Sequence, residues 1–232
     1  MAASKQVWSN PHPVEPTAGR WRMEDVPNPH DAYLPPPPAN DSERTRRELE
    51  ELHVLTANRT PADVDLIRYW AIQEFSPMTH WAALADEMAR RYQLSPPAAA
   101  RIHCLMNEAI FGSLIACWRF KYHFLRPRPT DLDPSIDTSV IPVPAHPSYP
   151  SGHSTVAGAA ATVLSRFFPD DQDRFWEQAE ASGFSRLLSG IHYRSDHEAG
   201  ILLGSAIGQQ AVLEANKDRA PKAYHLPPVQ TP

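Results

Sequence analysis

Cysteine is scarce in this chain of 232 residues, and so is any excess of charge of one sign. The two cysteines, Cys104 and Cys117, fall in one apolar helical segment, so we expect buried free thiols rather than a disulfide framework. The formal net charge at pH 7 is only -5, which offers no basic surface to a nucleic acid. We therefore expect no nucleic acid partner.

Long hydrophobic runs are also missing. The two best uncharged apolar stretches, residues 109–118 and 201–213, are shorter than the ~20 residues that a membrane span needs. Residues 1–20 contain no apolar run of the kind found in a secretory signal. The sequence therefore predicts no membrane span and a cytoplasmic location, and it carries no signal for an oligomeric state.

Proline, in contrast, is abundant, with 25 in the chain and nine of them before residue 39. This composition predicts an extended proline-rich arm over residues 1–40, with polyproline II in places and no core of its own. Trp8, Trp21 and Tyr33 are the side chains through which the arm could dock. Residues 41–220 are then expected to form one helical domain.

The pattern after residue 41 is helical, with capping residues before apolar faces of helical period. We expect helices over about 42–55, 61–75, 80–92, 96–121, 151–168, 170–190 and 195–216. The helix over 96–121 is apolar nearly all round, so we place it at the centre of the bundle. Seven prolines keep residues 127–150 irregular, and no alternating strand is present, so the predicted fold class is all-α.

Small residues suggest where two helices approach closely. Residues 157–161 read Ala-Gly-Ala-Ala-Ala, and Gly200, Gly204 and Gly208 recur every four residues. Small side chains on facing helices let the two backbones come close together.

Three short patterns carry the chemistry, in chain order: K-x6-R-P, P-S-G-H and S-R-x5-H-x3-D. The first and third supply fixed cations, and guanidinium and ammonium groups both bind oxyanions. In the second, the serine is a good helix N-cap, the first N–H groups of a helix are free to bind an anion, and glycine permits close approach. The residues are Lys121 and Arg128, then Ser151, Gly152 and His153, then Arg186, His192 and Asp196.

Two histidines have distinct expected tasks. His192 and Asp196 are four residues apart, so on a helix they share a face, and the carboxylate can hold a proton on one ring nitrogen. The other nitrogen is then a lone pair, ready as a nucleophile or ligand. His153 is left as the general acid or base. A zinc site is disfavoured because the lysine and two arginines repel a divalent cation.

Taken together, the three patterns resemble the type 2 phosphatidic acid phosphatase/vanadium haloperoxidase superfamily over about residues 60–212. The resemblance implies a helical bundle of that type. It also implies that His192 bonds the phosphorus or vanadium and that His153 works on the axial oxygen. The equatorial oxygens are implied to be bound by Lys121, Arg128, Ser151, Gly152 and Arg186.

The residues resemble both branches of this superfamily. Trp118, His146 and the sequence around the second and third patterns are similar to the haloperoxidases. The candidates to line a halide site or to support the oxyanion site are Trp118, His146 and Arg126. Taken alone, Arg126 also fits an ordinary solvated surface charge. The short spacing between the second and third patterns resembles the compact acid phosphatases.

Three functions follow. We favour a metal-independent phosphohydrolase without cofactor, which cleaves a small-molecule phosphate ester through a phosphohistidine. The first alternative is a haloperoxidase with vanadate as cofactor and His192 as its ligand, acting on halide and hydrogen peroxide. The second is a non-catalytic anion-binding or scaffold protein that works through the proline-rich arm.

Overall fold

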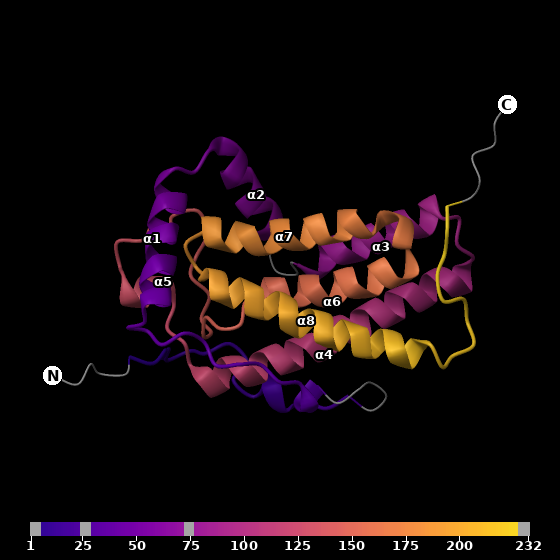
Figure 1. Ribbon diagram of the computed structural model, residues 1–232, viewed down its shortest axis with the longest axis horizontal. Coiled ribbons are helices and arrows are strands. Elements are labelled where there is room, and N and C mark those ends of the chain that lie inside the picture. Colours follow the sequence, from indigo (N-terminus) through magenta and orange to yellow (C-terminus); the bar gives the residue numbers. More distant parts are fainter. Residues whose placement is uncertain (1–5, 24–28, 72–76, 227–232) are drawn as a thin grey trace.

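The computed structural model describes residues 6–23, 29–71 and 77–226, and it confirms the all-α fold class, because those residues contain no β-strand (Figure 1). The α-helices are α1 (Glu43–Ala57), α2 (Pro61–Ala71), α3 (Met78–Arg91), α4 (Pro96–Phe124), α5 (Pro129–Leu132), α6 (Gly152–Phe167), α7 (Gln172–Leu188) and α8 (Arg194–Ala215). No helix among them is long and apolar enough to cross a membrane.

The first helices begin where the capping residues predict. Ser42 precedes α1, and its Oγ accepts a hydrogen bond from the backbone N–H of Thr45 at 3.2 Å. Before α2, Thr60 and Asp63 exchange hydrogen bonds between side chain and backbone, which is the capping-box arrangement. The last part of the predicted helix over 61–75, residues 72–75, lies outside the described residues.

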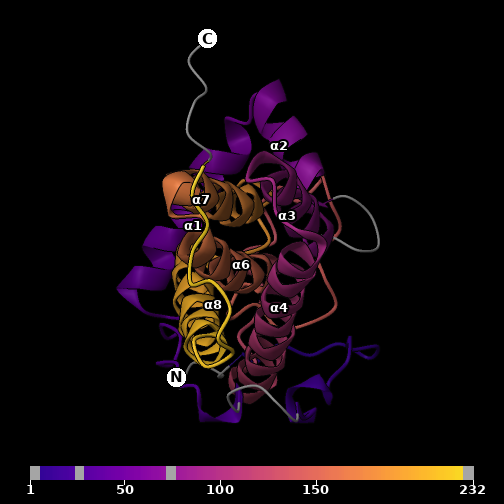
Figure 2. The ribbon, with the colours of Figure 1, turned by 90° about the vertical axis from the view of Figure 1, so that its right-hand side faces the viewer.

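The centre of the bundle is α6, not α4 as predicted. Contacts with α3, α4, α7 and α8 surround α6, as the end-on view shows (Figure 2). The small side chains of residues 157–161 explain this, because they let neighbours approach from several sides. Helix α4 keeps an exposed face, where Phe111 is 40% exposed.

The predicted close approach of α6 and α8 is confirmed. A Cβ atom on Gly204 would lie 2.0 Å from the carbonyl oxygen of Thr155, and one on Gly208 would lie 2.8 Å from that of Ala159. These distances are shorter than any van der Waals contact. The glycines of α8 therefore let its backbone lie directly against α6.

One cysteine prediction is wrong. Cys117 is buried, but Cys104 is exposed. The inward side chains of this part of α4 are Ile102 and Met106. Each is two residues, or about 200° around the helix, from Cys104, which therefore faces away from the core.

The described part of the arm lies along α4 and the loop that follows it. Trp8 is buried and its backbone N–H donates to the carbonyl of Leu125 at 2.8 Å, whereas Trp21 is 45% and Tyr33 81% exposed. The arm also joins the predicted irregular segment 127–150, because Val14 N–H donates to a carbonyl of that segment at 2.8 Å. Within the segment, one helical turn forms, α5.

Candidate active site

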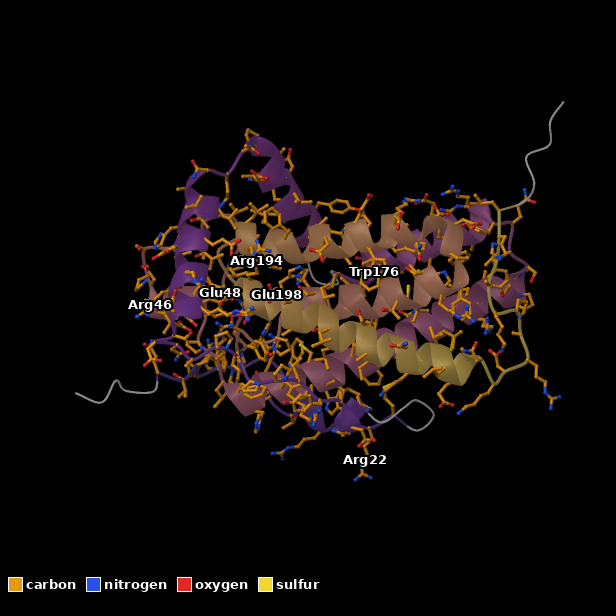
Figure 3. The ribbon with its side chains drawn as sticks, viewed as in Figure 1. Arg22, Arg46, Glu48, Trp176, Arg194 and Glu198 are labelled. Carbon is orange, nitrogen blue, oxygen red and sulfur yellow. The ribbon has the colours of Figure 1, made fainter. Side chains whose placement is uncertain are left out.

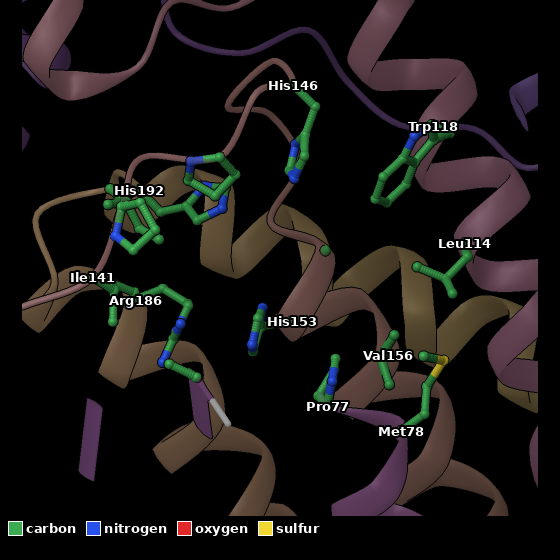
Figure 4. Close-up of a pocket in the computed structure, with 15 residues that line it drawn as sticks. Pro77, Met78, Leu114, Trp118, Ile141, His146, His153, Val156, Arg186 and His192 are labelled. Atoms are coloured by element: carbon green, nitrogen blue, oxygen red, sulfur yellow. The ribbon is translucent and has the colours of Figure 1, made fainter. Parts of the chain in front are cut away.

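A cavity of about 430 Å³ opens where the start of α6, the end of α7 and the loop before α6 meet. In Figure 4, His153 lies between Arg186 and His192 on one side and Val156 and Met78 on the other. Most other lining residues are apolar. The predicted site residues that line the cavity are Trp118, His146, Gly152, His153, Arg186 and His192.

His192 and Asp196 meet as predicted, but they do not share a helix. His192 lies two residues before α8, and Asp196 is in the first turn of that helix. The carboxylate turns back across the helix start, where Oδ2 accepts from Tyr193 N–H at 3.2 Å and lies 2.9 Å from Nδ1 of His192. A capping carboxylate thus replaces the expected i, i+4 helical pair.

The partners of His192 determine its tautomer. Nε2 lies 3.0 Å from Nη1 of Arg128, and a guanidinium can only donate hydrogen bonds. Nε2 must therefore accept, and the ring proton must lie on Nδ1, which faces the carboxylate of Asp196. Burial and the charge of Arg128 lower the pKa of His192 well below its usual value. The ring is neutral, with a lone pair on Nε2.

Asp196 is held as an anion in the interior. Its Oδ1 lies 2.7 Å from Nη1 of Arg126, and its Oδ2 accepts from the hydroxyl of Ser148 at 2.5 Å. Burial alone would raise the pKa of Asp196, but Arg126 and the hydrogen bonds of His192 and Ser148 lower it below the usual value. Arg126 is therefore a buried partner of the site and not a solvated surface charge.

Lys121 is buried and faces the backbone of the loop before α6. Its Nζ donates to the carbonyls of Pro147 at 2.8 Å, Ser148 at 3.1 Å and Pro150 at 2.5 Å. Burial lowers the pKa of Lys121 to about 7. In this structure the ammonium group holds the loop in place and does not line the cavity.

The carboxyl end of α2 supports Arg186 and His153 through backbone carbonyls. Arg186 Nη2 donates to the carbonyl of Ile67 at 3.0 Å, and Nε2 of His153 lies 2.9 Å from that of Trp70. A carbonyl only accepts, so the neutral ring of His153 carries its proton on Nε2. Burial lowers the pKa of Arg186 to about 9, and burial with the charge of Arg186 lowers that of His153 to about 3.

Ser151 and Gly152 start α6 as predicted. Ser151 is the N-cap, with Oγ accepting from Ser154 N–H at 3.4 Å, and its own N–H donates to the Asp196 carbonyl at 2.9 Å. The first N–H groups of a helix have no partner within it. Gly152 lines the cavity, and a Cβ atom added to it would lie 3.6 Å from the ring of Trp118.

His146 occupies the rim beside Trp118. The two ring centroids lie 5.1 Å apart, and Nδ1 of His146 lies 3.1 Å from Nη2 of Arg128. Burial and the nearby cations Lys121 and Arg128 lower the pKa of His146 well below its usual value. Both side chains proposed from the haloperoxidase resemblance thus face the same cavity.

Sequence reasoning missed three contributors. Ser148 donates to Asp196, the Trp70 carbonyl holds His153, and Glu48 on α1 pairs with Arg126 at 3.2 Å. Ser148 lies close to the second pattern, so its position in the sequence could have identified it. Glu48 precedes Arg126 by 78 positions and has none.

Comparisons with known proteins identify relatives of this chain. The model of the PAP2 superfamily matches residues 102–217, half of the chain. An acid phosphatase of Zymomonas mobilis is 28% identical over 191 residues, covering 80% of this chain and 69% of that protein. A vanadium-dependent bromoperoxidase of Ascophyllum nodosum is 36% identical over 93 residues, 28% of this chain and 17% of that protein.

Among solved structures, a bacterial vanadium-dependent iodoperoxidase matches 92% of this chain with a TM-score of 0.78 and 26% identity. This chain spans only 62% of that protein's length. The chain belongs to the PAP2 superfamily, which confirms the predicted family. Its relatives include both phosphatases and haloperoxidases, and membership in this enzyme superfamily disfavours a purely scaffolding role.

Proposed function

We propose that the protein is a metal-independent phosphohydrolase that cleaves phosphate esters through a phosphohistidine. One observation carries the proposal: His192 lines the cavity as a neutral ring, with its proton held toward Asp196 and its Nε2 accepting from Arg128, a donor that can pass to a phosphoryl oxygen when substrate binds. The acid phosphatase of Zymomonas mobilis, similar over most of the chain, supports the same choice.

The chemistry needs no metal charge. Nε2 of His192 attacks phosphorus, the bond from phosphorus to the ester oxygen breaks, and His153 gives a proton to the departing oxygen. Water then attacks the phosphohistidine, which releases phosphate and restores the imidazole. Arg128 and Arg186, with the first N–H groups of α6, would neutralise the charge that develops on the phosphoryl oxygens.

His153 must gain a proton before it can donate one. In the free site, burial and Arg186 hold its pKa at about 3. A bound phosphate ester brings negative charge beside these cations, and an anion nearby raises the pKa of an imidazole. The substrate would thus help to protonate the acid that cleaves it.

Haloperoxidase activity is the second candidate, favoured by His146 and Trp118 at the rim of the cavity. The donor set that suits phosphate also suits vanadate, since both are tetrahedral oxyanions: Arg128, Arg186 and the α6 start would hold its oxygens, and His192 would be its ligand. When bound, vanadate supplies the activation of hydrogen peroxide for halide oxidation.

The two activities are separated by assaying the purified protein twice. We expect phosphate release from p-nitrophenyl phosphate that survives EDTA and is inhibited by vanadate. Bromination of an organic acceptor with vanadate, peroxide and bromide is the second assay, and His192→Ala is the control for both. Bromination without phosphate release would overturn the phosphatase proposal. Phosphatase activity that ignores millimolar vanadate would contradict the shared oxyanion site.

A further inference from the structure

Glu48 is a buried carboxylate on α1, only 6% exposed, and it lies outside the residues that the family model matches. Figure 3 shows it between α1 and the start of α8, near Arg194 and Glu198. A buried carboxylate is costly unless it is paired and hydrogen-bonded. The proposed mechanism gives it no task.

Besides Arg44, whose Nε donates to Oε1 of Glu48 at 3.3 Å, Arg126 and Ser195 form a closed ring of hydrogen bonds with this carboxylate. Oε2 of Glu48 accepts from Arg126 Nη2 at 3.2 Å and from the Ser195 hydroxyl at 2.8 Å, while Oε1 accepts from Ser195 N–H at 3.0 Å. Arg126 Nη1 closes the ring by donating to the Ser195 hydroxyl at 2.7 Å.

Arg126 links this ring to the catalytic pair. The same Nη1 donates to Asp196 Oδ1 at 2.7 Å, so one guanidinium bridges two buried carboxylates. Because Glu48 engages Nη2, Arg126 offers only Nη1 to Asp196. Oδ2 of Asp196 is thereby left for His192, Ser148 and the start of α8.

We propose that Glu48 is a positioning residue for His192, acting through Arg126 and Asp196. The inference rests on the proposed role of His192 as nucleophile or ligand. Without the Glu48 carboxylate, Nη2 of Arg126 loses its anionic partner. Arg–carboxylate pairs favour bidentate geometry, so the guanidinium would turn both nitrogens toward Asp196. Oδ2 would then be shared with Arg126, and its hold on the Nδ1 proton of His192 would weaken.

The test compares Glu48→Gln, which removes the charge and keeps the shape, with Glu48→Asp, which keeps the charge. Glu51→Gln is the matched control, because Glu51 also joins α1 to α8, through Arg194 Nε at 2.9 Å, without touching Arg126. Two quantities are measured: kcat and KM on p-nitrophenyl phosphate, and the downfield imidazole N–H proton signal that His192→Ala abolishes.

For Glu48→Gln we expect kcat to fall by up to about 100-fold, as for other small misplacements of a reacting group, with KM little changed. The His192 proton signal should shift or broaden. Glu48→Asp should recover part of kcat, and Glu51→Gln should leave both readouts as in the wild type. If Glu48→Gln does not fold, Glu48→Asp, whose shorter side chain weakens the contact with Nη2 of Arg126, should change the signal in the same way but less.

Two results would overturn the inference. One is an unchanged His192 proton signal in Glu48→Gln or, if that variant is not folded, in Glu48→Asp. The other is an equal loss of kcat in Glu48→Gln and Glu51→Gln, which would mean that Glu48 only docks α1. A wild-type protein that releases no phosphate would instead refute the proposed function, and the proton signal would still test the role of Glu48.

Discussion

His192 and His153 are both neutral and both border the cavity, yet their partners differ in chemical kind. His192 faces a carboxylate on one nitrogen and a guanidinium on the other, so its lone pair and proton are fixed in direction. His153 has a backbone carbonyl as its hydrogen-bond partner and lies near cations, of which Arg186 has the largest effect on its pKa. The first environment suits bond formation, and the second suits a proton that comes and goes with the substrate.

Substitutions of the two histidines should therefore reduce activity to different extents. We expect His192→Ala to lose several orders of magnitude in kcat, because the covalent route is removed. His153→Ala should lose roughly 10²–10⁴-fold on an alkyl phosphate, and less on a nitrophenyl phosphate, whose leaving group needs no proton. Asp196→Asn should be intermediate. If His153→Ala lost equal activity on the two substrates, His153 would not be the general acid. A fully active His192→Ala would refute the mechanism.

At the scale of single residues, local signals predicted well and long-range ones did not. The pairing of His192 with Asp196 was predictable because four residues separate them, although the helix assumed to hold both begins two residues after His192. Lys121 was expected at the oxyanion, but it donates to three loop carbonyls whose positions depend on the folding of the loop. No local pattern links Glu48 with Arg126.

At the scale of elements, the contact of α6 with α8 depends on glycine. A methyl group at Gly204 would lie 2.0 Å from the Thr155 carbonyl, so the two helices would have to separate. We expect Gly204→Ala to destabilise the fold by about 1–3 kcal/mol, as overpacked cores do, and to reduce activity because α6 carries His153. Urea unfolding with a parallel activity assay measures both effects.

Gly112→Ala in α4 is the matched control. There the nearest atoms to an added Cβ are side-chain atoms at 3.4 Å, so the methyl group fits. Alanine in a helix interior is favoured over glycine by roughly 0.5–1 kcal/mol, and we expect this variant to be as stable as the wild type or slightly more stable. A Gly204→Ala protein that matches Gly112→Ala in stability would contradict the close-packing argument.

Helix positions were predictable because caps and apolar periodicity are local, as Ser42 and Thr60 show. Which helix lies at the centre of the bundle was not predictable in this way. Hydrophobicity favoured α4, whereas the ability to accept neighbours on several sides belongs to the small residues of α6. Which helix is surrounded depends on the shapes of all the others.

At the scale of the whole molecule, buried neutral histidines should make the fold sensitive to acid. The pKa of His153 is about 3 when folded, against ~6.5 for an unperturbed histidine. Between these values the unfolded chain binds a proton that the folded chain does not, so the free energy of unfolding falls as pH falls. The slope is about 1.4 kcal/mol per pH unit for each such proton, and His146 and His192 act in the same direction.

Thermal unfolding followed by circular dichroism between pH 7 and pH 4 checks this. We expect the melting temperature to fall with pH in the wild type and to fall less steeply in His153→Gln, whose amide can still donate to Trp70. Exposed His12→Gln should behave as the wild type. Equal slopes in all three proteins would show that His153 takes up its proton without cost in the folded state.

The docking of the arm also has a consequence for synthesis on the ribosome. The backbone N–H of Val14 donates to the carbonyl of Ala145. Because Ala145 comes much later in the chain, the arm leaves the ribosome long before this partner is made. At roughly 5–20 residues per second, the wait is on the order of ten seconds. Proline offers no N–H for pairing with strands of other chains, and extended proline-rich segments collapse poorly. We therefore expect the prolines of the arm to limit its pairing with other chains until residue 145 has been made.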